Sequence, residues 1–385
     1  MISLVEIPGG HTAATATTGE AAVMRRLSTL DRFLPLWIAL AMAAGLGLGA
    51  LIPGFDDALD ALRIGTVSLP IALGLLLMMY PVLAKVRYEE LGRVTAQRRM
   101  IGASLALNWI VGPLLMFALA WLFLAGHPEY RTGLIIVGLA RCIAMVLIWS
   151  DLAKADNEAT ALLVAINSLF QIVAFSLLGW LYLTGLPTLL GLDTQGLDVS
   201  LWEVARTVLI FLGIPLAAGY LTRRLGLRRR GEDWYRTRFL PRIGPVALYG
   251  LLFTIVMLFA LQGDAITSDP LDVVLIAVPL LVYFLIMFFA SFWTGRALGL
   301  GYAQTGTLAF TAASNNFELA IAVCVGVFGA TSGQALAGVV GPLIEVPVLV
   351  ALVYVALWLG RRWFGAAEVD RHPIQTVHTP ETAEA

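Results

Sequence analysis

Apolar runs of about 20 residues recur along this chain, with short polar stretches between them. A helix needs about 20 apolar residues to cross roughly 30 Å of hydrocarbon, so each run is a candidate membrane-spanning helix. The ten runs lie at residues 33–51, 65–84, 101–124, 132–149, 158–183, 203–222, 243–262, 272–294, 303–328 and 335–360. The pattern therefore predicts an all-α polytopic membrane protein with ten transmembrane helices.

The composition agrees with that interpretation and excludes several other classes of protein. Of the 385 residues, 59% are hydrophobic and 13% are charged, and the mean hydropathy is +0.84. These values are typical of polytopic membrane proteins rather than soluble domains. The net charge of −1 gives no indication of a nucleic-acid partner, and two cysteines are too few for a secreted disulfide framework. The lipid bilayer is thus the expected environment.

Basic residues indicate how the chain is oriented in the membrane. Cytoplasmic loops collect Lys and Arg, and here the basic residues gather in alternate connections, most densely at residues 223–242. The loops between them carry mainly Asp and Glu. Both termini are therefore predicted to be cytoplasmic, in a multi-pass protein of the cell membrane. The arginine-rich stretch is most simply a determinant of topology, although contact with anionic lipid also fits its charge.

The spacing of the runs predicts an internal repeat. The third to fifth runs start near residues 101, 132 and 158, and the eighth to tenth start near 272, 303 and 335, an offset of 171 to 177. Five spans is an odd number, so the second half would be inverted relative to the first, as in many secondary transporters. The predicted organisation is a disordered tail at 1–26, five-helix repeats at 27–184 and 185–362, and a C-terminal tail at 363–385.

Polar residues interrupt the apolar runs at matching places in the two halves. Arg141 and Cys142 lie side by side in the fourth run, and the ninth run contains Asn315, Asn316 and Glu318. The offset brings these two sets into correspondence, so we expect polar groups at the same depth in both halves. Residues that favour broken helices lie close by, and broken helices expose backbone groups that line a cavity. They are Gly138, Gly306, Asn315, Pro342 and Pro347.

The fifth and tenth runs contain two further polar residues, Asn167 and Glu345, which the offset pairs with each other. Together with Arg141 and Glu318, Glu345 makes three ionisable residues at membrane depth. Each costs about 2.5 to 3.5 kcal/mol to insert, so such residues face a cavity, pair with one another and mark a transport pathway. The alternative is that Arg141 pairs with a carboxylate and only locks helices together.

Four blocks of the sequence resemble one family of membrane proteins. The blocks are GLARCIAMVLIWSDLA, NNFELAIAV, GPLIEVPVLVALVYV and LSTLDRFLPLWI. They are similar to the arsenical-resistance arsenite permeases of the Acr3 type, in the bile-acid/sodium symporter-like superfamily, and the resemblance covers about residues 27–362. It implies ten helices in two inverted five-helix repeats, with the fourth and ninth helices discontinuous where they cross.

The resemblance also implies roles for individual residues. Cys142 and Glu318 match the thiol and the carboxylate that the family requires for transport. Arg141, Asn167 and Glu345 match positions that are expected to support the same site. The full set predicted to bind substrate is Cys142, Glu318, Arg141, Asn315, Asn316, Asn167 and Glu345.

Chemistry gives a separate reason to single out these side chains. Trivalent arsenic prefers soft ligands such as cysteine, and one thiol, Cys142, would bind arsenite and still release it. Arsenous acid is uncharged near neutral pH, so its export against a gradient requires the movement of a second solute. A desolvated carboxylate is the natural proton carrier. We therefore expect proton antiport, with Glu318 as the first candidate for the carrier and Glu345 as the second; transport of antimonite is left open.

Other functions and partners are weighed against this one. No nucleotide-binding GxxxxGK[ST] loop occurs, so no cofactor and no intrinsic ATP drive is expected, and a partner ATPase is left open. An enzyme with Cys142 as nucleophile is disfavoured because no apolar run contains a histidine base, and the four histidines form no metal-ligand cluster. Cys324 is expected to be a buried apolar residue. A sodium-coupled importer of organic anions would bind its cation through Asn315, Asn316, Asn167, Gln171 and Glu345.

Overall fold

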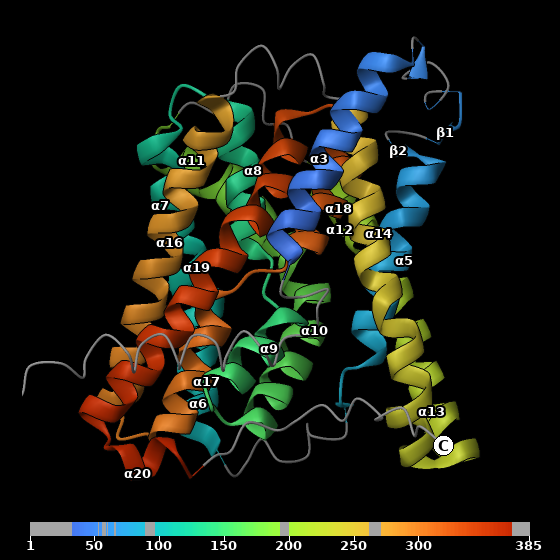
Figure 1. The fold of residues 1–385 in the computed structure, drawn as a ribbon. Coiled ribbons are helices and arrows are strands. Elements are labelled where there is room, and N and C mark those ends of the chain that lie inside the picture. The colour runs from blue at the N-terminus through green and yellow to red at the C-terminus, as the bar shows by residue number, and fades with distance from the viewer. Residues whose placement is uncertain are drawn as a thin grey trace, which may run out of the picture.

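The computed structural model describes residues 33–52, 54–55, 59, 61–64, 67–88, 97–192, 200–261 and 271–371. The predicted N-terminal tail at 1–26 lies outside these residues, and so does the predicted C-terminal tail from residue 372 onward. The chain folds into a bundle of helices (Figure 1). Helices satisfy their backbone N–H and C=O groups internally, which a segment must do in hydrocarbon because no water is available there.

The helices follow one another with few other elements between them. In chain order they are α3 (Leu34–Leu51), α5 (Leu69–Ala84), α6 (Arg98–Ala106), η2 (Leu107–Val111), α7 (Gly112–Phe123), α8 (Pro128–Leu139), α9 (Met145–Leu152), α10 (Asn157–Trp180), η3 (Leu181–Gly185), α11 (Leu186–Leu189), α12 (Leu201–Val208), η4 (Leu209–Gly213), α13 (Ile214–Trp234), η5 (Tyr235–Phe239), α14 (Leu240–Leu261), α16 (Leu271–Ala297), α17 (Tyr302–Ala313), α18 (Phe317–Phe328), α19 (Gly333–Trp363) and α20 (Ala366–Val369). Two short strands, β1 (Arg63–Ile64) and β2 (Val67–Ser68), pair antiparallel, with Arg63 opposite Ser68 and Ile64 opposite Val67.

Helix length and exposed apolar side chains identify a membrane protein. Among the described residues, five continuous helical stretches are long and apolar enough to cross a membrane, and three shorter helices are also apolar. Large apolar side chains project from the outside of the bundle, including Val173 at 78% exposure, Leu122 at 73% and Trp293 at 67%. Such side chains suit lipid tails rather than water. The chain is therefore a polytopic helical membrane protein.

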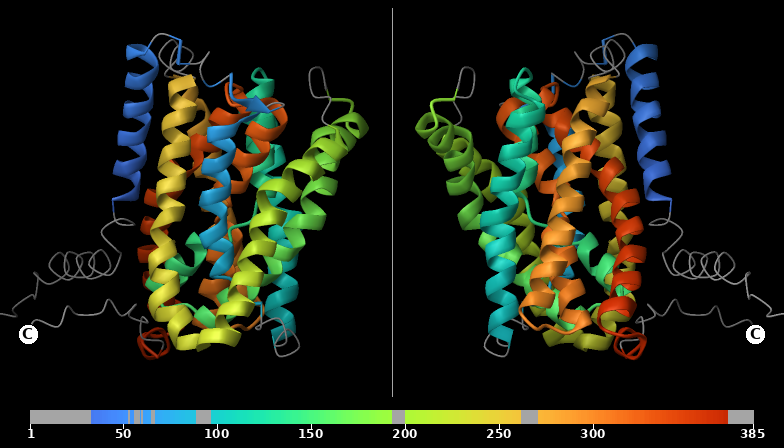
Figure 2. Two further views of the ribbon diagram at one scale, coloured as in Figure 1. Left: turned by 90° about the vertical axis from the view of Figure 1, so that its right-hand side faces the viewer. Right: turned by 90° about the vertical axis from the view of Figure 1, so that its left-hand side faces the viewer.

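The longest helical stretch, Leu201–Leu261, doubles back on itself at Gly231. Gly231 has φ +81° and ψ 168°, a conformation that glycine adopts readily and other residues do not. It turns the chain from α13 into η5 and α14. α5 packs against both α13 and α14, and α3 packs against α14. The left view of Figure 2 shows these four helices in a row toward the viewer.

The remaining helices form a second group, which contains the two helix breaks described below. α16 packs against α7, α17 and α19, while α8 packs against α7 and α19. α9, α10 and α17 pack on one another. α12 connects the two groups, because it leads through η4 into α13 of the first group and packs against α10 and α18 of the second.

Among the described residues there are four π-helical turns, η2 to η5, and a proline stands two residues after the end of each. Proline has no N–H, and its ring clashes with the carbonyl four residues earlier in an α-helix. A π turn widens the helix at that point, so the helix continues past the proline. In order the prolines are Pro113, Pro187, Pro215 and Pro241.

Two of the apolar runs are interrupted by non-helical chain. In the run at 132–149, α8 ends at Leu139 and α9 begins at Met145; in the run at 303–328, α17 ends at Ala313 and α18 begins at Phe317. The expectation of breaks near Gly306, Pro342 and Pro347 is wrong. Gly306 lies inside α17, and α19 runs without interruption through both prolines, where most of its side chains are buried.

Part of the predicted C-terminal tail packs against the bundle instead of extending away from it. In α20 the Val369 side chain is fully buried. The Glu368 carboxylate accepts a hydrogen bond from the Tyr302 N–H over 2.8 Å, at the N-terminus of α17. Asp370 forms an ion pair with Lys154 at 2.5 Å, in the turn between α9 and α10. Residues 366–371 thus contact the N-terminus of α17 and the turn between α9 and α10.

Candidate functional site

The two helix breaks lie against each other and join through their backbones. Arg141 and Asn315 form an isolated antiparallel bridge, and the Asn316 N–H donates to the Ala140 carbonyl over 3.0 Å. The Asn315 side-chain amide donates to the carbonyls of Val137 and Ala140 at 2.8 and 3.2 Å. The carbonyls at the C-terminal end of α8 are thus satisfied in part by the other break. Each break stabilises the other.

A long polar side chain from a continuous helix supports each break. The Arg141 N–H donates to Gln171 Oε1 of α10 over 2.9 Å, and the Asn315 N–H donates to Glu345 Oε1 of α19 over 3.0 Å. The partners are 30 residues apart in both cases. The sequence offset paired Asn167 with Glu345, but the hydrogen bonds make Gln171 the counterpart of Glu345.

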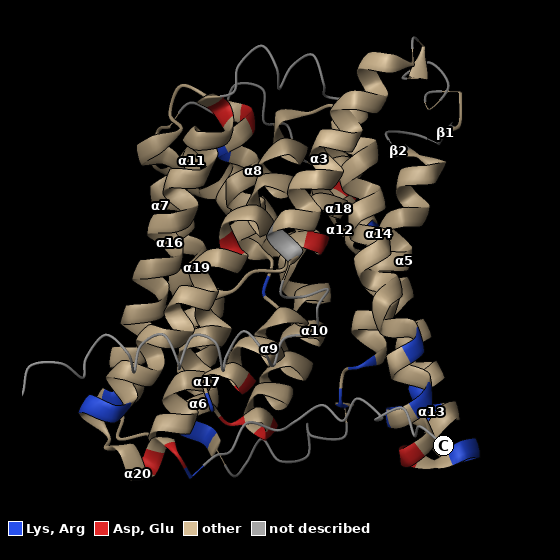
Figure 3. Cartoon of the chain, in the orientation of Figure 1, with Lys and Arg blue, Asp and Glu red and all other residues tan. Residues whose placement is uncertain are grey.

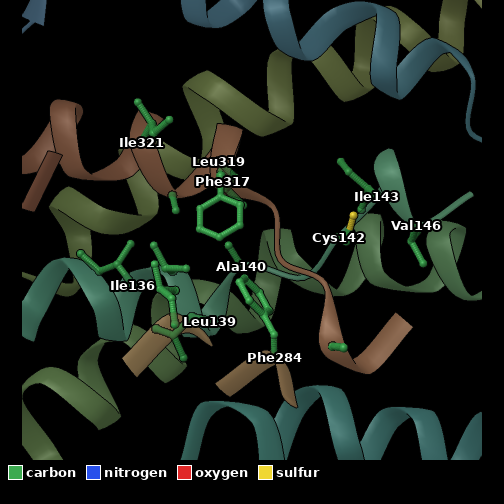
Figure 4. Packing of buried hydrophobic residues seen from close by; sticks show 14 of the residues in the cluster. Ile136, Leu139, Ala140, Cys142, Ile143, Val146, Phe284, Phe317, Leu319 and Ile321 are labelled. Carbon is green, nitrogen blue, oxygen red and sulfur yellow. The ribbon is translucent and has the colours of Figure 1, made fainter. Parts of the chain in front are cut away.

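The Cys142 thiol lies in the extended segment between α8 and α9. Cys142 is 2% exposed, and its thiol lies next to the Ser314 side chain and the Ala144 backbone. The carboxylates of Glu345 and Glu318 are close enough for their charges to act on the thiol. Figure 4 shows Cys142 within the buried apolar cluster, where it is a free cysteine. The crossing therefore combines one soft ligand with two acids, and both the thiol and Glu345 are buried.

Glu318 lies in the first turn of α18, directly after the second break. Asn316 is the N-cap of this helix, because its side-chain oxygen accepts from the Leu319 N–H over 3.0 Å. Helix N-termini carry partial positive charge, which stabilises an anion there. Glu318 is partly buried, and its carboxylate forms no hydrogen bond with another side chain in the part of the chain that the structure describes. It is the more accessible of the two acids, since Glu345 is 3% exposed.

Arg141 points away from the acids, toward α7 and α16. Its guanidinium donates to the Tyr283 hydroxyl over 2.8 Å and to the Gly138 carbonyl, and the residue is fully buried. No described acidic side chain forms an ion pair with it. The alternative in which Arg141 pairs with a carboxylate and locks helices together is therefore wrong for these residues.

The guanidinium fits beside Gly112 because glycine has no side chain. A Cβ at Gly112 would lie 2.8 Å from Arg141 Nη1, 3.0 Å from the Tyr283 hydroxyl and 3.1 Å from the Leu107 carbonyl. Gly112 also closes the π turn η2, since its N–H bonds to the Leu107 carbonyl. The widened helix and the missing side chain together make room for a buried cation.

Asn167 lies one turn before Gln171 on α10. It contacts Trp109 of η2 and not the backbone of the first break. Its side-chain oxygen accepts from the Trp109 indole N–H over 3.3 Å, and the Gln171 amide donates to its backbone carbonyl over 3.2 Å. Several polar atoms around the crossing have no hydrogen-bond partner among the described residues, although they are buried. They are Asn167 Nδ2, Arg141 Nε, Asn315 Oδ1 and Asn316 Nδ2. Such atoms are available to a polar solute.

Two contributors to the site were not predicted from the sequence. Tyr283 is a single tyrosine in the apolar α16, and Ser314 precedes the asparagines of the second break. A hydroxyl in an apolar helix gives no sequence signal, because α16 also contains Ser291 and Thr294 and the importance of each depends on which residue of another helix it contacts. The described residues contain no group of three or more His, Cys, Asp or Glu side chains that could hold a metal ion.

Comparison with known proteins identifies the family. The profile of the Sodium Bile acid symporter family matches residues 72–269. The arsenical-resistance protein Acr3 of Corynebacterium glutamicum is 57% identical over 350 residues, which cover 91% of this chain and 95% of that protein. The chain belongs to the sodium bile acid symporter family, as an Acr3-type permease.

More distant relatives span nearly the same length. Acr3 of Alkaliphilus metalliredigens is 33% identical over 344 residues, covering 87% of this chain and 94% of that protein. An uncharacterised transporter of Synechocystis is 36% identical over 359 residues, covering 87% of this chain and 91% of its own length. Family membership therefore applies to both helix breaks and not to one segment alone.

Proposed function

We propose that this protein exports arsenite from the cytoplasm in exchange for protons. The observation that carries the proposal is the crossing of the two breaks, where the Cys142 thiol lies near the carboxylates of Glu345 and Glu318 inside a membrane protein. Two relatives that cover most of the chain are arsenical-resistance proteins. A soft ligand and an acid are the two groups that arsenite exchange for a proton requires.

The single thiol suits a transporter better than a storage site. Trivalent arsenic has a strong preference for sulfur ligands. Cys324, the other cysteine, is fully buried in α18 and is not among the groups that contact Cys142. Cys142 therefore supplies one sulfur, and the remaining contacts to arsenous acid come from hydrogen bonds, for which the unpaired amide atoms of the two asparagines are suited. One sulfur bond leaves release possible. The same chemistry admits antimonite as a second cargo.

The two acids have different surroundings and, in this proposal, different roles. Glu345 is buried, and its Oε1 holds the Asn315 N–H, so it maintains the second break. Glu318 is partly exposed and free of side-chain partners among the described residues, so a change in its charge disturbs fewer contacts. We therefore assign the role of proton carrier to Glu318.

The proposed arrangement is ten spans in two inverted five-helix repeats, with both termini in the cytoplasm. The paired hydrogen bonds to Gln171 and Glu345 support a repeat, because they join equivalent places in the two halves. The basic residues at the α13–η5 end support the orientation. A reporter active only in the cytoplasm should work when inserted at residues 223–242 and fail near Asp264.

The proposed function is tested by arsenite accumulation in everted membrane vesicles with an imposed pH gradient. Wild type should accumulate arsenite when the gradient is present and should not when it is collapsed. Glu318→Gln should abolish uphill accumulation while preserving arsenite exchange at equal pH, because the amide keeps the shape of the side chain and removes the titratable group. Glu203→Gln, at an exposed acid on α12, is the matched control and should transport normally.

Two results would change the assignment. Uphill transport that survives in Glu318→Gln and is lost in Glu345→Gln would move the proton site to α19. Transport that requires sodium and is independent of the pH gradient would favour the sodium-coupled importer. The Asn315 Oδ1, unpaired among the described residues, and the Glu345 carboxylate offer oxygen ligands for the cation.

A further inference from the structure

Guanidinium groups are concentrated where α13 turns into η5 and α14. We call residues 224–242 the arginine hairpin. Its exposed arginines are Arg224, Arg228, Arg229, Arg230, Arg236, Arg238 and Arg242. The same stretch holds two acids, Glu232 and Asp233, so seven positive and two negative charges give a net charge of +5, in a chain whose total is −1.

Contacts within the hairpin leave most of this charge uncompensated. The ion pair between Arg236 and Glu232 is long, at 3.9 Å, and both side chains are more than half exposed, at 60% and 65%. Exposed pairs of this kind contribute little. Arg230 lies over the Trp234 ring at 5.0 Å, a contact that orients the guanidinium without neutralising it.

Aromatic side chains fix the height of the hairpin relative to the helix ends. The Tyr235 hydroxyl donates to the carbonyl of Ala84, at the end of α5, over 2.9 Å, and the residue is fully buried. Phe239 stacks against both Trp234 and Tyr235, with ring centroids 5.7 and 5.0 Å apart. Aromatic residues of this type anchor helices at the boundary between lipid tails and water. Trp234 is a partly exposed aromatic of this set, and its position beside Arg230 supports a place for the guanidiniums at the level of the lipid headgroups.

The other helix ends on the same side of the bundle carry a different charge pattern. Around α17 and α20, Lys154 is paired with Asp370, and Glu368 accepts from a backbone N–H. Figure 3 shows acidic and basic residues intermixed there and mainly basic residues at the end of α13. The tendency of cytoplasmic loops to be basic accounts for the sign of the charge. It does not account for so many arginines on one hairpin that lack a close acidic partner among the described residues, an excess that suits a local anionic ligand.

We propose that the arginine hairpin binds the phosphate groups of anionic phospholipids in the leaflet at this end of the bundle. Guanidinium binds phosphate through two parallel hydrogen bonds, and clusters of basic residues next to spanning helices attract anionic lipid. The bound lipid would hold α13 and α14 in place, and with them α5, which packs against both. This inference does not depend on the identity of the transported solute.

The test uses the full-length protein purified in detergent, with its thermal unfolding temperature as the measurement. Phosphatidylglycerol should raise that temperature, whereas phosphatidylcholine with the same acyl chains and inorganic phosphate should not. In the triple variant Arg228→Gln, Arg229→Gln, Arg230→Gln the apparent affinity for phosphatidylglycerol should fall roughly 10- to 100-fold, and added salt should weaken binding to wild type. The matched control is Arg361→Gln with Arg362→Gln, at exposed arginines at the end of α19, which should bind as wild type does.

Replacement of the same three arginines by lysine keeps the charge, so this variant separates a loss of lipid binding from a loss of folding. The lysine variant should retain most of the binding. The proposal is overturned if inorganic phosphate stabilises wild type as well as phosphatidylglycerol does, if the control loses as much affinity as the glutamine variant, or if the lysine and glutamine variants are equally impaired.

Discussion

The close fit of the Arg141 guanidinium beside Gly112 predicts how far Gly112→Ala lowers the free energy of unfolding. The backbone of Gly112 is helical, with φ −59° and ψ −54°, so alanine meets no backbone strain. The new methyl would nevertheless lie 2.8 Å from Arg141 Nη1 and 3.0 Å from the Tyr283 hydroxyl, both well inside van der Waals contact. The guanidinium must move, and the hydrogen bond between these two groups is the contact that it loses.

The size of the effect follows from three contributions. Overpacking costs about 1 to 3 kcal/mol, and loss of a hydrogen bond to a charged group costs about 1.5 to 3 kcal/mol. The higher helix propensity of alanine returns up to about 1 kcal/mol. We therefore expect Gly112→Ala to lower the free energy of unfolding by about 1.5 to 6 kcal/mol, and to reduce arsenite transport because Arg141 supports the first break.

The assay compares denaturant unfolding in detergent with arsenite uptake into everted vesicles. Gly102→Ala is the matched control, because Gly102 lies in the preceding helix α6 with no atom within 4 Å of the added methyl. That variant should be as stable as wild type or slightly more so. Tyr283→Phe removes one of the clashing atoms, so its effect and that of Gly112→Ala should be less than additive. If Gly112→Ala and Gly102→Ala have the same free energy of unfolding and the same arsenite uptake, the close packing of Arg141 against Gly112 has no energetic importance.

Two further predictions concern the thiol and the ion pair at α20. Cys142→Ser keeps size and polarity but removes the sulfur, so arsenite transport should be lost while membrane insertion is retained. The control, Cys324→Ala, should transport arsenite nearly as wild type does. Equal loss of transport in both variants would disprove selection by the Cys142 thiol. The Lys154 ammonium lowers the pKa of Asp370 below its ordinary value of 3.8. A lowered pKa in the folded state means that the pair stabilises the protein fully above pH 4 and loses this contribution as the pH falls further. Asp370→Asn should remove that part of the pH dependence of thermal unfolding, and high salt should reduce it in wild type; an unchanged pH profile would show that the pair contributes nothing.

The apolar runs were sufficient to predict the class of protein, because the length of a spanning helix is set by the thickness of hydrocarbon. Cys142, Asn315 and Asn316 were conspicuous for a related reason. Thiol and amide groups in the middle of an apolar run need an explanation, and the structure brings all three to the crossing of the two breaks.

The partners of these residues were harder to predict because they depend on the rotation of neighbouring helices. Asn167 and Gln171 are one turn apart on α10, and a shift of four residues in the offset decides which of them supports the first break. The prolines at 342 and 347 did not predict breaks either, since α19 continues through the buried Pro342 and the exposed Pro347 alike. By contrast, Pro113 and its three counterparts each follow a π turn, so the positions of these prolines carry information about helix geometry.

The neighbouring positions of Arg141 and Cys142 acquire their meaning from the conformation of the break. In a helix, side chains at adjacent positions are about 100° apart, whereas in extended chain they point to opposite sides. The extended chain at the bridge directs Arg141 to Tyr283 and places the Cys142 thiol beside Ser314. The fixed positive charge is thereby held on the far side of the backbone from the sulfur, and the charges that act on the thiol are those of the two acids. A continuous helix at this place would not separate the cation from the soft ligand in this way, so the break itself contributes to the chemistry that we propose for the site.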